Sequence, residues 1–223
     1  MHITKRGARG MEIVRDDSDR FNFVRSAFIT NDVHQSNDWR ALSVNKPLFY
    51  RPESWPDHRP LVSILAWVLL DNHFHMLVQE VEEGGIAKFM QRFSNSLSRY
   101  FNEKYNGRGS IFQGSYKGRL VDTDEYLQYV HAYIVAKNTF EMCPGGLKRA
   151  LTDFEYAWEN AKQYKFSSLL TATDGLESPL LDIPAIQSLG LVRKDFKQYV
   201  RSMITHHAKT KARYTNVDLL ENW

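Results

Sequence analysis

The sequence has little cysteine and lacks a long hydrophobic run. Cys143 is the only cysteine among the 223 residues, which excludes an internal disulfide framework and any cysteine-rich zinc module. The longest apolar run extends from Leu61 to Leu70 and is far too short to span a bilayer. No apolar stretch follows the basic residues near the start, so we expect no signal peptide. These features predict a cytoplasmic protein that does not bind membranes.

The basic residues are unevenly distributed along the chain. The whole chain has a formal net charge of +3, and 43% of its residues are hydrophobic, as in ordinary globular proteins. Between Gly84 and Leu120, however, seven basic residues accompany a single acidic one, Glu103. Such a block indicates a surface for a polyanion, although a solvated helix face followed by basic loops would give the same pattern. The seven residues are Lys88, Arg92, Arg99, Lys104, Arg108, Lys117 and Arg119.

Three segments are predicted to be β-strands. His2 to Lys5 opens the chain as a short strand. Leu61 to Leu70 is rich in β-branched and aromatic residues, which is typical of a buried strand. His73 to Gln79 alternates in polarity, and Asp71-Asn72 before it is typical of a turn. These two strands are therefore predicted to form a hairpin.

Apolar spacing and capping residues predict several helices. A helix is expected after Asp16, where acidic side chains favour a helix start. The best-defined helix covers Ile86 to Phe101, because its apolar residues recur at helical spacing. Thr123 is expected to cap another helix that runs to about Ala136. Two further helices are predicted at residues 150–164 and 192–206.

The order of these elements predicts an α+β fold, in which helices pack on a central antiparallel sheet and a helical extension follows. We expect a first domain at residues 1–148 and a mainly helical extension at residues 149–223. Residues 31–60 are polar, contain four prolines and show no clear period. They are predicted to form a long insertion loop, and a loop of that length in a compact domain is more often functional than idle.

His73 and His75 stand two residues apart on a predicted strand. The two-residue period of a strand directs both imidazoles to one face and Phe74 to the other. Two neighbouring imidazoles are half of a divalent-metal site. An isolated pair of this kind is, however, more often a surface feature or a hydrogen-bonded part of the core.

Three tyrosines, Tyr126, Tyr129 and Tyr133, share the helix predicted after Thr123. A tyrosine is a poor nucleophile at its ordinary pKa of about 10. It becomes useful when a neighbouring cation polarises the phosphate that it attacks. The structural alternative for any one of them is a core residue whose hydroxyl reaches the rim.

Several segments together resemble the single-tyrosine HUH transposases of bacteria, most closely the branch of REP-associated tyrosine transposases. They occur in the order found in that family and cover roughly residues 1 to 140. The segments are HITKRG (2–7), DDSDRF (16–21), AWVLLDNHFHML (66–77), residues 86–105, GSIFQG (109–114) and residues 126–134. The tail also resembles the extension present in part of this branch. The resemblance implies a ferredoxin-like HUH nuclease fold.

The resemblance also implies a mechanism and a set of site residues. His73 and His75 would bind Mg²⁺ or Mn²⁺, and the hydroxyl of Tyr133 would attack a phosphate of single-stranded DNA. The products would be a 5′-phosphotyrosine and a free 3′ hydroxyl. Because a later transfer can reverse this step, bond energy is conserved and no nucleotide cofactor is needed.

The sequence departs from the family at the third metal ligand. That ligand is usually a Gln or Asn one helical turn after the tyrosine, where residues i and i+4 share a face. Here position i+4 is Lys137, which cannot ligate a metal, and Asn138 comes one residue late. Either an overwound or broken helix brings Asn138 to the ion, or Lys137 contacts the phosphate, or another group serves. We favour Asn138.

Basic residues are the candidates for contacts with DNA phosphates. Trp39, Tyr50 or Trp55 of the insertion loop could stack on unpaired bases or pack the loop onto the body. The resemblance implies a partner that is single-stranded DNA with hairpin, REP-like elements, located at the bacterial nucleoid. The predicted phosphate contacts are Lys5, Arg6, Arg9, Lys88, Arg92, Arg99, Lys104, Arg108 and Lys117.

The sequence leaves three alternatives open. The chain could be a decayed or domesticated copy that binds hairpin nucleic acid without cutting it. It could be a replication-initiator or relaxase-type HUH nuclease. A zinc hydrolase that uses His73 and His75 would need a further ligand that no motif supplies. The sequence also leaves open whether the protein acts as a monomer or as a homodimer.

Overall fold

The fold is built on an antiparallel sheet with helices on both faces. The computed structural model describes residues 1–34 and 46–213. Within these residues four strands hydrogen-bond in the order β2-β3-β1-β4. This order, with helices after the first and third strands, is the ferredoxin-like arrangement, and it confirms the predicted α+β class. The strands are β1 (His2–Arg6), β2 (Val62–Leu69), β3 (His73–Glu80) and β4 (Lys117–Arg119).

Strands β2 and β3 form the hairpin that the sequence predicts. Their pairing runs from Val62 opposite Glu80 to Leu69 opposite Phe74, with a bulge between Ile64 and Ala66. Every residue of β2 is buried. Part of this burial comes from the C-terminal half of the chain, because the backbone N–H of Leu69 donates to the Phe166 carbonyl across 3.0 Å. The outer edge of β2 is thereby covered along part of its length.

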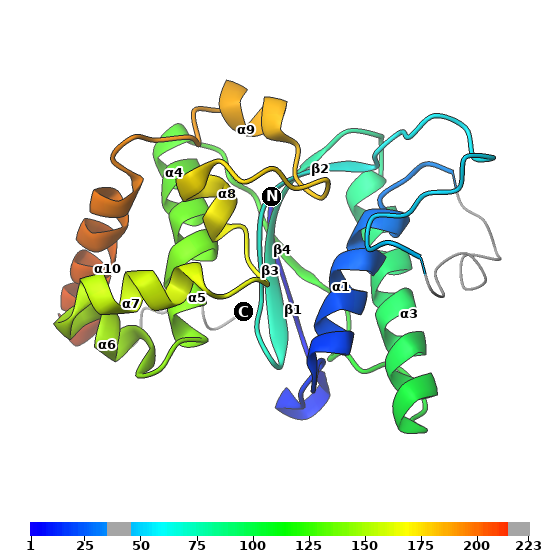
Figure 1. Ribbon diagram of the computed structural model, residues 1–223, viewed down its shortest axis with the longest axis horizontal. Helices are drawn as coiled ribbons and strands as arrows, with labels where there is room; N and C mark the ends of the chain where they lie inside the picture. Colours follow the sequence, from blue (N-terminus) through cyan, green and yellow to red (C-terminus); the bar gives the residue numbers. More distant parts are fainter. Residues whose placement is uncertain (35–45, 214–223) are drawn as a thin grey trace.

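Helices α1 (Asp17–Thr30) and α3 (Gly85–Tyr105) cover one face of the sheet (Figure 1). Asp16 caps α1 as predicted, because its side chain accepts a hydrogen bond from the N–H of Asp19. Phe23 of α1 lies 5.0 Å from Phe93 of α3 and 5.2 Å from Phe74 of β3, measured between ring centroids. The two helices and the strand therefore share one aromatic core.

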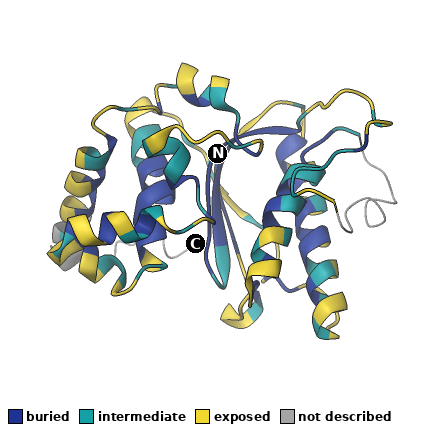
Figure 2. Cartoon of the chain, viewed as in Figure 1, coloured by how far each residue is buried: buried dark blue, intermediate teal, exposed yellow. Residues whose placement is uncertain are grey.

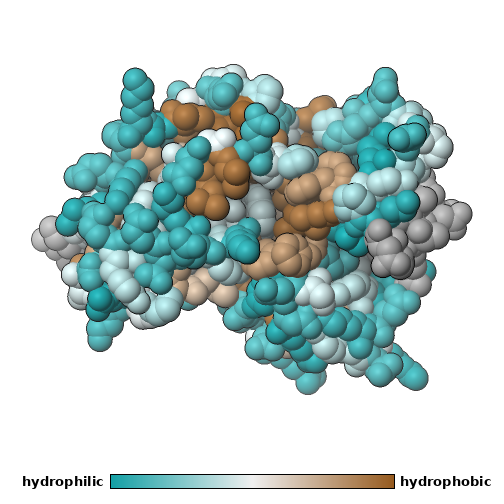
Figure 3. Space-filling model, in the orientation of Figure 1, coloured by the Kyte–Doolittle hydropathy of each residue, from teal (hydrophilic) through white to brown (hydrophobic). Residues whose placement is uncertain are grey.

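The other face of the sheet is covered by the helices after β4. Thr123 caps the first of them as predicted. The inward sides of these helices are buried and their outward sides are exposed (Figure 2). Their outer surfaces are largely hydrophilic, and apolar side chains gather near the middle of the face shown in Figure 3. The elements are α4 (Asp124–Ala132), η2 (Tyr133–Lys137), α5 (Asn138–Glu141), α6 (Gly146–Thr152), α7 (Phe154–Lys162), α8 (Leu169–Asp174), α9 (Ile183–Ser188) and α10 (Phe196–Arg213).

The structure differs from the sequence predictions in the C-terminal half. The single helix expected at 150–164 is broken at Asp153, whose side chain accepts from the Tyr156 N–H and so starts α7. The stretch between the last two predicted helices contains two short helices, α8 and α9. The helix expected to end near Ala136 continues through η2 into α5. An aspartate that can cap a helix also interrupts one, which explains the break.

The described parts of the insertion loop, residues 31–34 and 46–60, contain no helix or strand. Trp39 lies outside the described residues. Among the described residues, no helix combines the length and the apolar character that crossing a bilayer requires.

A buried histidine of α4 predicts a loss of stability in acid. His131 is 2% exposed, its Nδ1 has no hydrogen-bond partner, and burial lowers its pKa to about 4. Between pH 6.5 and pH 4 the unfolded chain binds a proton here that the folded chain does not, so the free energy of unfolding falls as the pH falls. The full effect is on the order of 3 kcal/mol. Urea unfolding at pH 7 and pH 4.5 should show that His131→Leu removes this part of the pH dependence. If the free energy of unfolding falls equally between pH 7 and pH 4.5 in the variant and in the native chain, His131 is not the cause.

Candidate active site

The imidazoles of β3 and two polar side chains of β1 share one face of the sheet. His75 pairs with Thr4 across the antiparallel ladder, and His2 precedes Thr4 by one strand period. His73 lies on the same face, and its ring centroid is 5.1 Å from that of His75. Phe74 points to the opposite face, into the core with α1. The structure therefore confirms the prediction that His73 and His75 face one side of the sheet and Phe74 the other.

Both imidazoles are engaged through Nδ1. The Nδ1 atom of His75 lies 2.9 Å from Nε2 of His2 and 2.9 Å from Oγ1 of Thr4. The Nδ1 atom of His73 lies 2.6 Å from Oδ1 of Asn72. His2 and Thr4 were not expected to contact the pair, because the register between β1 and β3 cannot be read from the spacing along the chain.

Tyr133 faces this imidazole cluster from the helical layer. Its ring centroid lies 5.9 Å from that of His75 and 6.2 Å from that of His2, edge to face in both cases. Tyr129, one turn earlier, lies 6.2 Å from Tyr133. The predicted meeting of tyrosine and imidazoles is thus present, but Tyr133 is only 1% exposed.

The helix changes its winding at Tyr133. Residues Tyr133–Lys137 form a π-helical turn, in which the N–H of Asn138 donates to the carbonyl of Tyr133. A π-turn accommodates one residue more than an α-turn and is frequent at functional sites. The helix is therefore underwound here, and the prediction of an overwound or broken helix is wrong. The wider turn brings both Lys137 and Asn138 one turn above the tyrosine.

Lys137 and Asn138 are both buried beside Tyr133. Lys137 is 2% exposed, and its Nζ lies 2.7 Å from Oε1 of Glu141 and 4.8 Å from the centroid of the Tyr133 ring. Asn138 is 1% exposed, and its Nδ2 has no hydrogen-bond partner among the described residues. A buried amide with an unused polar atom is costly, and it leaves a group that a ligand could satisfy.

The site is neutral at the imidazoles and cationic around them. Burial, together with His2, His73, Lys137 and Arg6, lowers the pKa of His75 well below its usual value. Burial, followed by the N-terminal amine and Arg119, lowers the pKa of His2 to about 4. Near pH 7 both rings are uncharged, and several of their neighbours are positive. Such surroundings suit an anion such as a phosphodiester.

The donor atoms fit a divalent ion that is held by imidazoles and an amide. A ligating imidazole must be neutral, and His75 meets this condition. In residues 1–34 and 46–213, no group of three or more His, Cys, Asp or Glu side chains is arranged so that it could hold a metal ion. A third ligand would therefore come from another residue type, and Asn138, one helical turn from Tyr133, could offer its amide oxygen.

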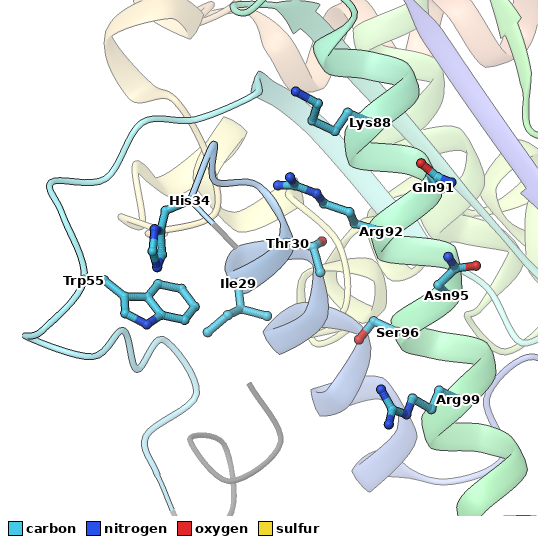
Figure 4. A pocket seen from close by; sticks show the side chains of 10 residues that line it. All are labelled: Ile29, Thr30, His34, Trp55, Lys88, Gln91, Arg92, Asn95, Ser96 and Arg99. Atoms are coloured by element: carbon cyan, nitrogen blue, oxygen red, sulfur yellow. The ribbon is translucent and has the colours of Figure 1, made fainter. Parts of the chain in front are cut away.

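A groove with basic and aromatic walls lies on the opposite side of the sheet, between α1 and α3 (Figure 4). It has a volume of about 510 Å³. The rings of His34 and Trp55 lie 4.9 Å apart on one wall. Lys88, Arg92 and Arg99 of α3 line the other wall. These are three of the predicted phosphate contacts.

The remaining predicted phosphate contacts fall into two groups. Lys5 is buried and donates to the Gly114 carbonyl across 3.1 Å, and Lys104 donates to carboxylate oxygens of Asp16 and Asp19 at 2.6–2.8 Å. Both ammonium groups are occupied within the chain. The other members, Arg6, Arg9, Arg108 and Lys117, are exposed.

One segment of the chain is similar to a known protein family. Residues 58–137 match the family described as "Transposase IS200 like". The matched segment runs from just before β2 to the end of η2 and contains His73, His75 and Tyr133. No curated protein and no solved structure matches the chain. The match supports a transposase-like DNA endonuclease for this segment.

Proposed function

We propose that the chain is a single-tyrosine HUH transposase of the REP-associated type, which cleaves and rejoins single-stranded DNA beside hairpins. The observation that carries the proposal is the position of Tyr133, whose ring lies 5.9 Å from that of His75 inside the segment that matches IS200-like transposases. Such an enzyme would act at the bacterial nucleoid, as a monomer or a homodimer.

In the proposed reaction Tyr133 is the nucleophile that cleaves the DNA strand. The hydroxyl of Tyr133 loses its proton as its oxygen forms a bond to phosphorus, and the bond between phosphorus and the 3′ oxygen breaks. The 3′ oxygen takes up a proton and leaves as a free hydroxyl, while the 5′ phosphate stays on the tyrosine. Attack by a 3′ hydroxyl reverses the step and joins the strands. The protein contributes positioning and neutralisation of charge.

His73 and His75 would hold Mg²⁺ or Mn²⁺ through imidazole nitrogens and Asn138 through its amide oxygen. When bound, the ion would withdraw electron density from a non-bridging oxygen of the scissile phosphate. Lys137, held beside the Tyr133 ring, adds positive charge to the same surroundings.

Burial of Tyr133 imposes an opening step before cleavage. Helices α8 and α10 pack against η2, and a 1% exposed phenol cannot reach a phosphodiester while it is covered. The same burial favours a second candidate function, a hairpin-binding protein that no longer cuts. A covalent protein–DNA adduct on a denaturing gel, formed with Mn²⁺ and a hairpin-bearing single strand, distinguishes the two, because only the enzyme forms it.

The groove between α1 and α3 is the proposed contact for the DNA hairpin. Trp55 and His34 offer flat rings on which an unpaired base can stack, while Lys88 and Arg99 of α3 can contact the backbone phosphates. Arg92 donates to the Asp32 carbonyl. Because the groove and Tyr133 lie on opposite faces of the sheet, hairpin binding and cleavage would use different surfaces of the molecule.

Neutralising two cations of the groove should reduce the salt dependence of hairpin binding. Each phosphate contact that is lost lowers the slope of log affinity against log salt by about 1. The double variant Lys88→Ala/Arg99→Ala should therefore lose a slope of about 2 in fluorescence anisotropy titrations at several salt concentrations. Lys148→Ala, an exposed cation of α6 on the other face, is the matched control and should leave the slope unchanged. Equal slopes for all three proteins would contradict this DNA surface.

A further inference from the structure

Each imidazole of β3 is anchored through Nδ1 by a side chain that lies outside the predicted ligand set. Asn72 is the anchor for His73, at 2.6 Å. The amide oxygen of asparagine can only accept a hydrogen bond, so Nδ1 of His73 donates and its lone pair lies on Nε2. For His75, too, the hydrogen-bond partners of Nδ1 decide which ring nitrogen carries the proton.

His75 meets two side chains of the neighbouring strand at the same nitrogen. Oγ1 of Thr4 and Nε2 of His2 each lie 2.9 Å from its Nδ1. The ring of His2 also stacks on that of His75, with centroids 5.2 Å apart and planes inclined by 24°. His2 is 4% exposed, Thr4 8% and His75 4%, so solvent competes little for these hydrogen bonds. The orientation of the His75 ring is therefore set from β1.

We propose that His2 and Thr4 are positioning residues that hold His75 in the tautomer with hydrogen on Nδ1 and the lone pair on Nε2. The proposal rests on the proposed function, in which His75 is a metal ligand through a nitrogen that must be unprotonated. The hydrogen bond at one ring nitrogen decides what the other nitrogen can do. Both rings of the pair then present Nε2 as the electron-pair donor, His73 through Asn72 and His75 through the two residues of β1.

The arrangement works because two possible acceptors lie next to the same nitrogen. Nε2 of His2, 2.9 Å from Nδ1 of His75, can accept the proton that Nδ1 offers. Thr4 provides a second acceptor at the same distance. A neutral histidine in water favours the opposite tautomer, with hydrogen on Nε2, and loss of these acceptors would return His75 to it.

Nitrogen NMR of the full chain with ¹⁵N-labelled histidine, at neutral pH and without metal, tests the tautomer directly. The His75 signals are assigned with a His75→Gln variant. The native protein should show hydrogen on Nδ1 of His75. His2→Phe keeps the ring that packs on His75 and Tyr133 but removes both nitrogens, and together with Thr4→Val it should shift His75 to the Nε2–H form. His2→Gln restores an acceptor oxygen and should restore the Nδ1–H form.

Binding of Mn²⁺ alone, followed by electron paramagnetic resonance, gives the second readout. Loss of a group that orients a ligand weakens metal binding by about 10- to 100-fold, and this loss is expected for His2→Phe/Thr4→Val but not for His2→Gln. In a His75→Ala background the β1 substitutions should cause no further loss. Thermal unfolding of each variant shows whether weaker Mn²⁺ binding comes from loss of the fold or from a wrongly oriented His75. If the double variant does not fold, the single substitution Thr4→Val, which exchanges only the hydroxyl for a methyl group, replaces it in both measurements.

The proposal is overturned if native His75 carries its hydrogen on Nε2, or if its tautomer is the same in the native chain and in the folded double variant. Failure of the proposed function has a different signature. In that case the native chain forms no DNA adduct and binds no Mn²⁺, whereas the tautomer measurement, which needs neither DNA nor metal, still gives its own answer.

Discussion

Replacing Tyr133 with phenylalanine should abolish the covalent protein–DNA adduct and leave hairpin binding unchanged. The substitution removes one oxygen atom and keeps the ring that packs against His75, His2 and Tyr129. In the proposed reaction that oxygen forms the bond to phosphorus, so no adduct can form without it. The groove that we assign to the hairpin lies on the other face of the sheet and is untouched by the change. Denaturing gels with Mn²⁺ measure the adduct, and anisotropy measures binding.

Tyr129→Phe is the matched control for this experiment. Tyr129 lies one turn before Tyr133 on the same helix, with its ring 6.2 Å away, and should retain full adduct formation. An adduct of native yield from Tyr133→Phe would exclude Tyr133 as the nucleophile. Loss of the adduct in both variants would indicate that the substitutions disturb the packing of the helix, and it would not identify Tyr133 as the nucleophile.

Asn138→Ala should reduce both Mn²⁺ affinity and the rate of adduct formation, the latter by at least about 100-fold, because misplacement of a reacting group by even 1 Å has effects of that size. The reason is the π-turn, which links the Asn138 N–H to the Tyr133 carbonyl and places the buried amide one turn above the nucleophile. Asn138→Asp retains an oxygen ligand and should retain Mn²⁺ binding. Calorimetry with Mn²⁺ and single-turnover cleavage assays measure the two effects.

Lys137→Ala distinguishes two hypotheses: that Asn138 is the third metal ligand, and that Lys137 contacts the phosphate. Lys137 is paired with Glu141 at 2.7 Å, and its removal should leave Mn²⁺ affinity intact if Asn138 is the third ligand. If Lys137→Ala abolishes cleavage while Asn138→Ala is silent, the lysine contacts the phosphate and Asn138 is not a ligand.

Three of the four strands and the first two helices could be predicted because each depends on local patterns, whereas β4 was not predicted. Alternating polarity placed His73 and His75 on one face of a strand, and the Asp71-Asn72 turn set the hairpin. The apolar stripe from Ile86 to Phe101 marked α3, and Asp16 marked the start of α1. All of these features are encoded within a few residues of one another.

Features that depend on distant residues could not be predicted. The contact of His2 with His75 joins residues that are 73 positions apart, and only the register of β1 on β3 creates it. Lys104 seemed available for DNA in the sequence, yet Asp16 and Asp19 of α1 occupy its ammonium group. The π-turn was visible only as a mismatch between the family spacing and the positions of Lys137 and Asn138.

Mass spectrometry of the tryptic peptides from the DNA adduct tests the central claim most directly. Native protein is incubated with a hairpin-bearing single strand and Mn²⁺, digested with nuclease and protease, and searched for a residue that carries a 5′ nucleotide phosphate. We expect this mass on the peptide that contains Tyr133, and on that residue after fragmentation. A nucleotide on Tyr126, Tyr129 or any other residue, or an adduct-free protein that still binds the hairpin, would contradict the assignment.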